Sequence, residues 1–446
     1  MEQLESFFLE ENDPVVGLLR DRINEKESFT NLIKSDAFLK LIPVEVSSSP
    51  GEILLMLLMY CKKYAPSLEG LSYLCKIINR IFALPVFPES AYLLNEMCST
   101  QSKVTYYKMC PECSLVLLDS NASTVECIHC KKLVKVPKNY SSTTFALIDP
   151  SDIISRHVHF YEDHYNFVVK ERPRTRDIIK DIYDGRMYKK LVNSLAPSDK
   201  HQYVTLTLNT DGAEPFKSSN DSAWPIYVMI NELPLEKRFK HIITVCTWFG
   251  KSQPIMSVYM DEFVKMMNKI KSTGINCIVK GEERSLKPYV INSTDDTPAR
   301  KKCNGKTNFN SYEGCDWCYR NGFWYAGNMR YIVDGEIELR DANTTMTYML
   351  KAQAKGLPIH GVKHISPLIF LEEFDIDESF SVDQLHAIDS GAGKQGTKFI
   401  YHRKLNPLQR DLCDQYLLQI RAPSSISRLT RSLKQRSTWK AKEWQN

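Results

Sequence analysis

Two Cys-x2-Cys pairs give the chain four soft metal ligands within a short stretch. Cys110 and Cys113 form the first pair, Cys127 and Cys130 form the second, and thirteen residues separate them. The residues between the pairs begin with SLVLLDS, which is expected to form a strand that runs into a polar turn. Two such knuckles at the ends of a short hairpin place four thiolates around one ion. The sequence therefore predicts a structural Zn²⁺ site of the zinc-ribbon type, a module that binds DNA, RNA or protein.

A third pair, Cys315 and Cys318 in EGCDWC, supplies half of another tetrahedral site. A structural zinc ion normally takes four protein ligands. His360 and His364 have a spacing that zinc histidines use, but HISPL is typical of the start of an apolar strand or loop, so this completion is the less favoured one. The remaining candidates inside the chain are Cys303, His386 and His402.

Two aspartates follow strand patterns that lie far apart in the sequence. YVTLTLNTDG alternates apolar residues with threonines and ends in Asp211, and a strand through Val290 and Ile291 is followed by Asp295 and Asp296. Carboxylates that converge at neighbouring strand ends hold divalent cations about 3.5–4 Å apart, which activate and stabilise the oxygens of a phosphodiester. Hard oxygen ligands suit Mg²⁺ or Mn²⁺. Taken singly, Asp211 is equally typical of an Asp-Gly turn and Asp296 of a helix cap.

The elements that must position these acids follow a recognisable order. Strands are expected over Trp224–Leu233 and His241–Gly250, and a helix with a core-facing methionine stripe begins at Met256 and stops at Gly274. Three strands, a helix and a fourth strand are the order of the ribonuclease H-like fold, in which the first and fourth strands lie side by side. We therefore expect an α/β protein with a mixed sheet of this kind, which brings Asp211 and Asp296 together.

The rest of the chain divides by composition. Ser49 to Glu52 has the form of a capping box, and a second helix is expected over Leu68–Phe82. RPRTR at Arg172–Arg176 precedes a helix-like DIIKDIYDGRMYKKL and suits an interdomain segment that touches a phosphate backbone. The expected parts are an acidic segment (1–29), a helical domain (30–100), the zinc ribbon (101–140), a connector (141–200), the ribonuclease H-like core (201–310), an insertion with Cys-x2-Cys (311–420) and a basic tail (421–446).

Composition narrows the class of protein. The longest apolar run, Ile53–Tyr60, is far shorter than the roughly 20 residues of a membrane span. The acidic start does not resemble a signal peptide, so an intracellular protein with reduced cysteines is expected. The net charge is +5, but residues 397–446 hold eleven bases against three acids. Charge alone favours a solvated surface over a phosphate-binding one.

Several blocks together resemble a known family. They are NTDGAEPFKSSNDSAWPIYVMINELP, TWFGKSQP, DDTPARKKCNGKTNFNSYEGCDWC, GVKHISPLIFL and FSVDQLHAIDSGAGKQ. In this order, from the zinc ribbon to the last residue, the chain is similar to the transposases of CACTA-type (En/Spm) DNA transposons. The resemblance implies DNA strand cleavage and transfer by a D-D-E triad, with Asp211 as the first acid and Asp296 as the second.

The same resemblance places a histidine pair and the catalytic glutamate late in an inserted domain. In this chain both would fall beyond Asn446, so a truncated, catalytically impaired core is expected. Glu443 and three further acids, Glu372, Glu373 and Asp383, are more typical of surface residues than of a third catalytic acid.

The expected protein is therefore a nuclear, transposon-derived DNA-binding protein with Zn²⁺ as a structural ion and Mg²⁺ or Mn²⁺ at its acids. DNA is the expected partner, self-association is left open, and no membrane is involved. One alternative is a zinc-dependent protein-interaction module that retains the core as a scaffold. Another is an active nuclease with an unconventional third acid, which requires a carboxylate near Asp211 and Asp296.

Overall fold

The computed structural model describes most of the chain after residue 47. The described residues are 48–64, 66–82, 86–98, 104–117, 124–135, 144–173, 178–214, 222–332, 334–420 and 431–439. The acidic segment 1–29 and Glu443 lie outside them. The chain forms two compact units, Met1–Thr100 and Gln101–Asn446.

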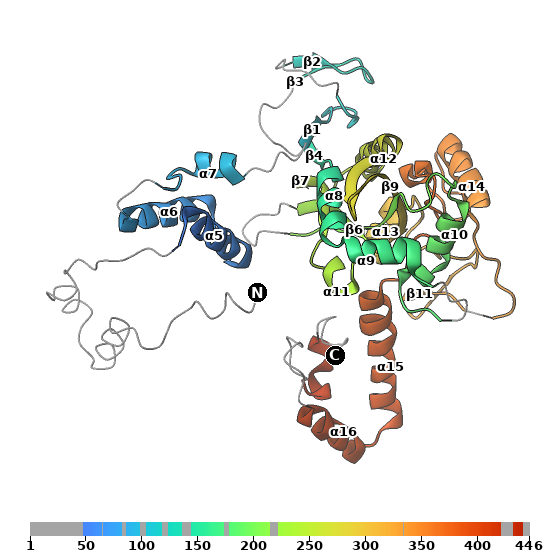
Figure 1. The fold of residues 1–446 in the computed structure, drawn as a ribbon. Helices are drawn as coiled ribbons and strands as arrows, with labels where there is room; N and C mark the ends of the chain where they lie inside the picture. The colour runs from blue at the N-terminus through green and yellow to red at the C-terminus, as the bar shows by residue number, and fades with distance from the viewer. Residues whose placement is uncertain are drawn as a thin grey trace. The chain divides into compact units, whose positions relative to one another are not determined.

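The first unit contains three helices, labelled α5, α6 and α7 in Figure 1. Their bounds are Pro50–Tyr64, Leu68–Phe82 and Ala91–Cys98. The capping box is present, because the Ser49 backbone N–H donates to Glu52 Oε2 at 2.7 Å and the Glu52 N–H donates to Ser49 Oγ at 3.3 Å. Leu71 and Cys75 of α6 are buried against Leu57 of α5, as the apolar stripe predicts.

The second unit is built on a seven-stranded mixed sheet with the order β1-β4-β7-β6-β5-β9-β8. Strand bounds are Val104–Lys108 (β1), Thr144–Ile148 (β4), Tyr203–Thr210 (β5), Ser222–Ile230 (β6), Ile243–Gly250 (β7), Ile275–Val279 (β8) and Glu282–Ser293 (β9). The mixed α/β class expected from the sequence is therefore confirmed. All but one residue of β5 are buried, which is the pattern of a central strand covered on both faces.

The pairing within this sheet determines which strand ends meet. β5 pairs with β6, and β6 with β7, in antiparallel fashion. β5 also pairs with β9, and this pairing is parallel, with Leu206 opposite Val290 and Leu208 opposite Ser293. The carboxyl ends of β5 and β9 consequently lie at the same edge of the sheet.

The hairpin of β8 and β9 is an element that the sequence analysis missed. β8 pairs antiparallel with β9 through a tight turn at Lys280 and Gly281, which have φ angles of 55° and 75°. Positive φ at both central residues is the geometry of a two-residue hairpin turn. The alternation of Ile275, Cys277 and Val279 before this turn was the available signal.

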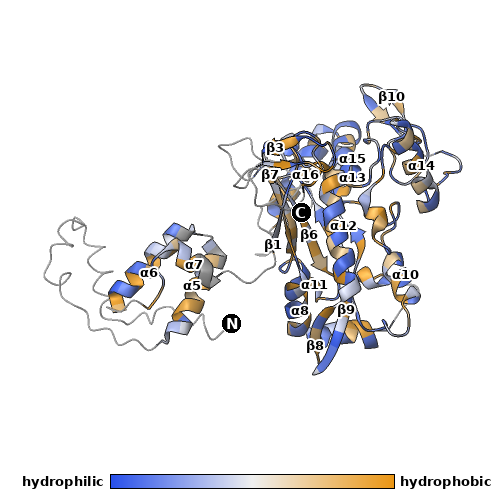
Figure 2. Cartoon of the chain, turned by 90° about the horizontal axis from the view of Figure 1, so that it is seen from above, coloured by the Kyte–Doolittle hydropathy of each residue, from blue (hydrophilic) through white to orange (hydrophobic). Residues whose placement is uncertain are grey.

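Helices cover the sheet between and after the strands. The helices of the second unit that precede β8 in the chain are α8 (Ser151–Phe160), α9 (Glu162–Asn166), the π-helix η1 (Phe167–Glu171), the 3-10 helix η2 (Ile182–Asp184), α10 (Arg186–Ser194), α11 (Leu235–Arg238) and α12 (Met256–Thr273). α12 has both hydrophobic and hydrophilic residues in Figure 2, and its buried side includes Met260, Phe263 and Met267. The predicted methionine stripe is thus part of the core, and Gly274 ends the helix with φ 74°.

The remaining elements follow β9 or belong to small hairpins. They are β2 (Thr124–Glu126), β3 (Leu133–Lys135), α13 (Thr297–Cys303), β10 (Phe323–Tyr325), β11 (Asn328–Arg330), α14 (Ala342–Lys355), η3 (Pro367–Phe370), η4 (Gln384–Gly393), α15 (Lys394–Phe399), η5 (Ile400–Lys404), α16 (Pro407–Gln419) and η6 (Leu433–Thr438). Of the expected SLVLLDS strand, the described residues 114–117 contribute only one bridge, between Val116 and Met109.

The helix expected from Asp177 begins later, at Arg186. The Asp184 carboxylate is buried and accepts two hydrogen bonds from Arg172, each 2.8 Å long, and one from the Lys180 backbone N–H at 2.9 Å. The Arg172 guanidinium holds the pKa of Asp184 well below its usual range. Arg172 is therefore engaged inside the protein and does not extend toward a phosphate backbone, while Arg174 and Arg176 lie outside the described residues.

Among the described residues, no helix is both long and apolar enough to cross a membrane.

Candidate active site and metal centres

Three parallel chain segments end in register at one edge of the large sheet. Leu208 of β5 is opposite Ser293 of β9, and Ser293 forms a parallel bridge with Phe380 on its other side. The Ser293 N–H donates to the Ser379 carbonyl at 2.8 Å, and the Ser381 N–H donates to the Ser293 carbonyl at 2.9 Å. Segment 379–381 therefore extends the sheet by a short parallel stretch.

An aspartate follows each member of this register three residues later. Leu208 is followed by Asp211, Ser293 by Asp296, and Phe380 by Asp383. Because parallel segments share the direction in which they end, all three aspartates lie beyond the same edge. Asp211, Asp296 and Asp383 are called the acid edge below.

Asp211 is held at the acid edge by its glycine neighbour. The Gly212 N–H donates to Asp211 Oδ1 at 2.7 Å. A Cβ at Gly212 would lie 2.5 Å from the Trp224 ring, so only glycine fits there. Burial and the charge of Asp296 raise the pKa of Asp211, whereas the Gly212 N–H, His386 and Lys302 lower it. The carboxylates at 211 and 296 are thus close enough to repel each other.

Asp296 is the N-cap of α13. Its Oδ1 accepts a hydrogen bond from the Ala299 N–H at 2.8 Å, and Pro298 occupies the first turn of the helix. The side chain is half-buried. The helix-cap alternative and the metal-ligand alternative are therefore compatible, because the cap uses one carboxylate oxygen and leaves the second for another partner.

Asp295, in contrast, points into the protein. Its side chain is fully buried, Oδ1 accepts the Thr210 N–H at 2.8 Å, and Oδ2 accepts the Ser293 hydroxyl at 2.5 Å. Burial raises the pKa of Asp295 to about 7. This side chain joins the ends of β5 and β9 and so fixes the spacing from which Asp211 and Asp296 project.

Replacing Asp295 with Asn should make the protein relatively more stable as the pH rises. A carboxyl group whose pKa is raised by folding favours the folded state at low pH and loses that contribution as the pH rises toward about 7. Between pH 5 and pH 8 the wild type should lose roughly 2–3 kcal/mol that the Asn variant retains. Urea unfolding at both pH values measures this difference, and a constant offset between the two proteins would contradict it.

Asp383 and His386 form the third part of the acid edge. Asp383 caps η4, since its Oδ1 accepts the Leu385 N–H at 2.9 Å, and its Oδ2 contacts His386 Nδ1. His386 in turn is close enough to Asp211 to lower its pKa. The sequence alone predicts a surface acid at Asp383 and a candidate zinc ligand at His386. The register between segment 379–381 and β9, which places both residues at the acid edge, has no signal in the sequence.

The carboxylates of the acid edge are not gathered into a compact group of metal ligands in this structure. Among the described residues, the only group of three or more Cys, His, Asp or Glu side chains whose ligand atoms all lie within 4.8 Å of one another is the four-cysteine cluster. Glu372, another candidate for a third acid, contacts Lys271 of α12. Glu373 lies next to it, and both line a cavity with Tyr289 at a different part of β9.

The four cysteines of the predicted zinc ribbon do come together. Cys110 Sγ lies 3.8 Å from Cys130 Sγ, and Cys113 Sγ lies 3.6 Å from Cys127 Sγ. These separations suit four thiolates around one zinc ion, for which each Zn–S distance is about 2.3 Å. The four cysteines therefore form a compact group whose geometry can hold a metal ion such as zinc.

The same backbone hydrogen bond closes the turn at each Cys-x2-Cys pair. The Ser114 N–H donates to the Cys110 carbonyl, the Lys131 N–H donates to the Cys127 carbonyl, and each bond is 2.8 Å long. Ser114 and Lys131 have φ angles of 60° and 59°, which turn the chain sharply after the second cysteine of each pair. The Cys130 N–H lowers the pKa of Cys127, whereas burial and the neighbouring thiols raise the pKa values of Cys113 and Cys130, so Cys127 is the first of these three to become a thiolate.

Among the described residues, the cysteine pair Cys315 and Cys318 is not joined by further metal ligands. Cys315 Sγ and Cys318 Sγ are 3.3 Å apart, and no third ligand atom from the described residues completes a cluster with them. His360 Nδ1 faces Glu313 at 3.3 Å, and His364 Nδ1 faces the Ile365 carbonyl at 3.1 Å. The structure thus does not support completion of this site by His360 and His364.

One of the two residues between these cysteines, Asp316, connects the pair to the acid edge. Asp316 is buried and accepts bonds at Oδ1 from Lys301 Nζ and Asn304 Nδ2, both 2.8 Å long. Arg300 lies 3.7 Å from its other oxygen. Lys301 and Arg300 belong to α13, the helix that Asp296 caps. The Cys315–Cys318 turn is therefore fixed to the element that carries the second aspartate of the acid edge.

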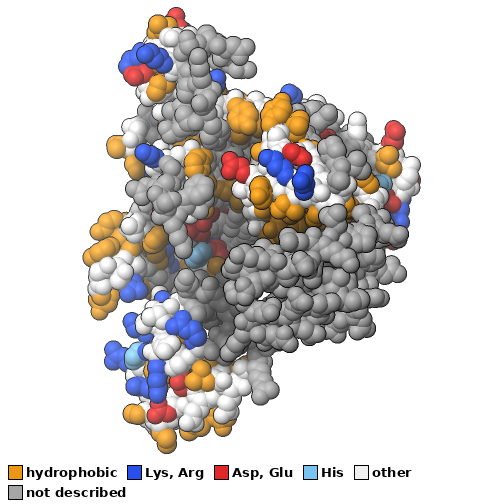
Figure 3. Space-filling model, turned by 90° about the vertical axis from the view of Figure 1, so that its left-hand side faces the viewer, with side chains coloured by type: hydrophobic (Ala, Val, Ile, Leu, Met, Phe, Trp, Pro, Cys, Tyr) orange, Lys and Arg blue, Asp and Glu red, His pale blue; other side chains and the backbone are white. Residues whose placement is uncertain are grey.

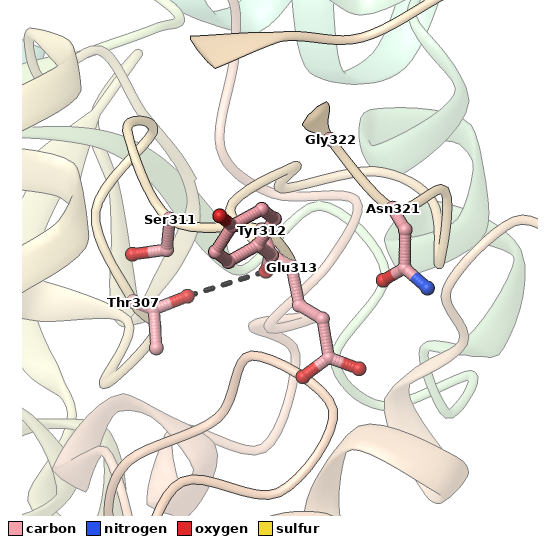
Figure 4. A pocket seen from close by; sticks show the side chains of 6 residues that line it. All are labelled: Thr307, Ser311, Tyr312, Glu313, Asn321 and Gly322. Atoms are coloured by element: carbon pink, nitrogen blue, oxygen red, sulfur yellow. Dashed lines mark hydrogen bonds between the residues drawn. The ribbon is translucent and has the colours of Figure 1, made fainter. Parts of the chain in front are cut away.

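A cavity of about 490 Å³ lies beside this turn. Figure 4 shows its lining, in which the Thr307 hydroxyl donates to the Glu313 carbonyl at 3.2 Å. The other lining residues are Ser311, Tyr312, Asn321 and Gly322. The cavity is lined by none of the acid-edge residues, so it is separate from the candidate active site.

Comparison with known proteins gives a family match over part of the chain. Residues 178–333 match the model of a transposase family described as transposase family tnp2. This segment contains β5, β6, β7, β9 and α13, and therefore two of the three acid-edge residues. No curated protein matches the chain. The similarity supports a transposase-type protein and, with it, interaction with DNA.

Proposed function

We propose that this chain is a transposon-derived DNA-binding protein of the CACTA type with a ribonuclease H-like core, which cleaves DNA strands in a metal-dependent reaction. Asp211 and Asp296 are the first two catalytic acids, and Asp383 is the third. The protein would act in the nucleus. The observation that carries the proposal is the register of three aspartates, each three residues beyond paired positions of neighbouring parallel segments.

The acid edge fits the proposed Mg²⁺ or Mn²⁺ by its chemistry. Asp211 and Asp296 offer hard oxygen ligands, and the charge of Asp296 raises the pKa of Asp211, an unfavourable repulsion that a divalent cation would relieve. When bound, the ions would polarise a phosphodiester and stabilise the charge on its oxygens. Asp211, Asp296 and Asp383 are the residues that would hold them.

The residues around the acids have supporting roles in this proposal. Asp295 joins β5 to β9 and keeps the first two acids at adjacent positions. His386 contacts Asp383 and fixes the orientation of its carboxylate. Asp383 thereby supplies the third carboxylate, in place of the glutamate that the family resemblance implies. The four-cysteine cluster would hold Zn²⁺ as a structural ion.

The proposal is tested with purified protein and a labelled DNA duplex at low salt. Wild-type protein should bind the duplex and nick it with Mn²⁺ but not with EDTA, and Asp211→Asn should bind without nicking. A protein that binds DNA no better than a neutral control would overturn the proposal.

A second function is favoured by the open geometry of the acid edge, in which the acids are not gathered around one point. In that case the protein binds DNA but does not cleave it, and the core acts as a scaffold. Wild-type protein and Asp211→Asn would then behave alike in every assay. The nicking assay therefore separates the two functions.

A further inference from the structure

One long helix connects the acid edge to the basic C-terminal part of the chain. η4, α15 and η5 follow one another without a break from Gln384 to Lys404, and the junction residues Lys394 and Ile400 have helical φ and ψ angles. Asp383 caps the first turn, and His386 lies close enough to Asp211 to lower its pKa. Figure 1 shows α15 leading away from the sheet.

Positive charge is concentrated along the second half of this helix. Lys398, Arg403 and Lys404 are exposed, and Lys394 is half-buried. Among the described residues, none of these four side chains forms an ion pair with a carboxylate, and the exposed Lys404 lies over the Phe399 ring at 5.8 Å from its centre. From Lys394 to Lys404 the helix contains no acid. The lower part of Figure 3, the region of α15 and α16 in Figure 1, shows Lys and Arg side chains gathered with few acids.

Other nearby cations are already used to hold the fold. Arg410 donates to the Tyr401 carbonyl at 2.7 Å, and Arg436 donates to the Leu433 carbonyl at 2.7 Å and stacks on the Tyr401 ring at 4.1 Å. Lys434 pairs with Asp411 at 2.9 Å. These contacts fold α16 and η6 back against the long helix. The cations left for an external partner are therefore those of the helix itself.

The length of the helix suits a nucleic-acid duplex. The ten residue steps from Lys394 to Lys404, which contain the four cations, span roughly 15 Å at about 1.5 Å per residue. Duplex DNA advances about 3.4 Å per base pair, so this length corresponds to roughly four or five base pairs. Four cations within this distance, with Lys394 and Lys398 one turn apart on the same side of the helix, produce a high local positive charge that suits a phosphate backbone.

We propose that the helix from Gln384 to Lys404 is a phosphate-binding track for duplex DNA, along which Lys394, Lys398, Arg403 and Lys404 contact the backbone beside the strand held at the acid edge. The inference rests on the proposed function, since it assumes that the acid edge receives DNA. It adds the element that holds the flanking duplex and the direction in which that duplex leaves the site.

The test compares two triple variants that remove the same charge. Lys398→Gln, Arg403→Gln and Lys404→Gln together remove the exposed cations of the track. The control replaces Lys200, Lys240 and Lys355 with Gln. All three control residues are exposed, and Lys200 and Lys240 precede β5 and β7 at the end of the sheet opposite the acid edge.

Affinity for one labelled duplex is measured against salt concentration. Each phosphate contact contributes about 0.9 to the slope of log K against log salt, so the track variant should lose roughly 2–3 from this slope and about 10²-fold in affinity near 0.1 M salt. The control variant should lose far less. Equal losses in the two variants would overturn the track, while binding by the wild type would leave the proposed function intact.

A second measurement needs no variant and decides the case if the track variant fails to fold. Bound duplex should protect Lys398 and Lys404 of the wild type from acetylation, detected by mass spectrometry, and leave Lys240 reactive. Unchanged reactivity of Lys398 and Lys404 under saturating DNA would overturn the track. Protection by an acidic polypeptide equal to that by DNA would assign the surface to a protein partner.

Discussion

Asp296→Asn is expected to reduce metal-dependent DNA nicking by about 10²–10³-fold, because one electrostatic contact to the reacting group is typically worth ~3–4 kcal/mol. Folding should be preserved, since Asn is as good an N-cap as Asp and its amide oxygen can accept the Ala299 N–H. The variant should also lower the pKa of Asp211, because a charge that raises it has been removed. Single-turnover nicking rates and carboxyl NMR titration measure the two effects.

Asp341→Asn is the matched control for this substitution. Asp341 caps α14 in the same way, with its Oδ1 accepting the Thr344 N–H at 3.0 Å, and it does not belong to the acid edge. The control should nick DNA at the wild-type rate. If Asp296→Asn kept full activity, or if both variants lost it equally, Asp296 would be a helix cap and nothing more.

Cys127→Ser is expected to remove about one zinc ion per chain and to unfold the region around the two knuckles. Cys127 is fully buried in a cluster with the other three thiols, and the free energy of zinc binding at structural sites, about 10–16 kcal/mol, is also folding free energy for the segment that binds it. Zinc content by mass spectrometry and limited proteolysis between β1 and β4 measure the change.

Cys413→Ser provides the control, because Cys413 is exposed and outside every cysteine cluster. It should retain all bound zinc. Cobalt substitution gives an independent readout, since only the wild type and this control should show the absorption of a tetrahedral thiolate site. Unchanged zinc content in Cys127→Ser would mean that these four cysteines do not bind the ion.

The features that could be predicted most fully from the sequence are those in which a short segment determines its own structure. The capping box at Ser49 and the four-cysteine spacing both depend on residues that are close together in the chain, and both are present. The helix from Met256 to Gly274 was predictable for the same reason, since its apolar spacing and its glycine stop are local.

Several contacts between segments that are distant in the chain could not be predicted from the sequence. The difference between Asp295 and Asp296 depends on the Thr210 N–H, which reaches Asp295 from 85 positions away and takes it out of solvent. Asp383 lies at the acid edge because Phe380, three residues earlier, forms a parallel bridge with Ser293. Arg172 likewise looked available for DNA until the fold paired it with Asp184. In each case long-range pairing decides which polar side chain stays free.

We propose that Asp211, Asp296 and Asp383 face a common divalent cation. Crystals soaked with Mn²⁺ and measured at a wavelength where manganese scatters anomalously would test it directly. An anomalous peak is expected within about 2.0–2.2 Å of carboxylate oxygens of both Asp211 and Asp296, with Asp383 as the nearest further acid. Manganese bound elsewhere on the protein, with no peak at this edge of the sheet, would contradict it.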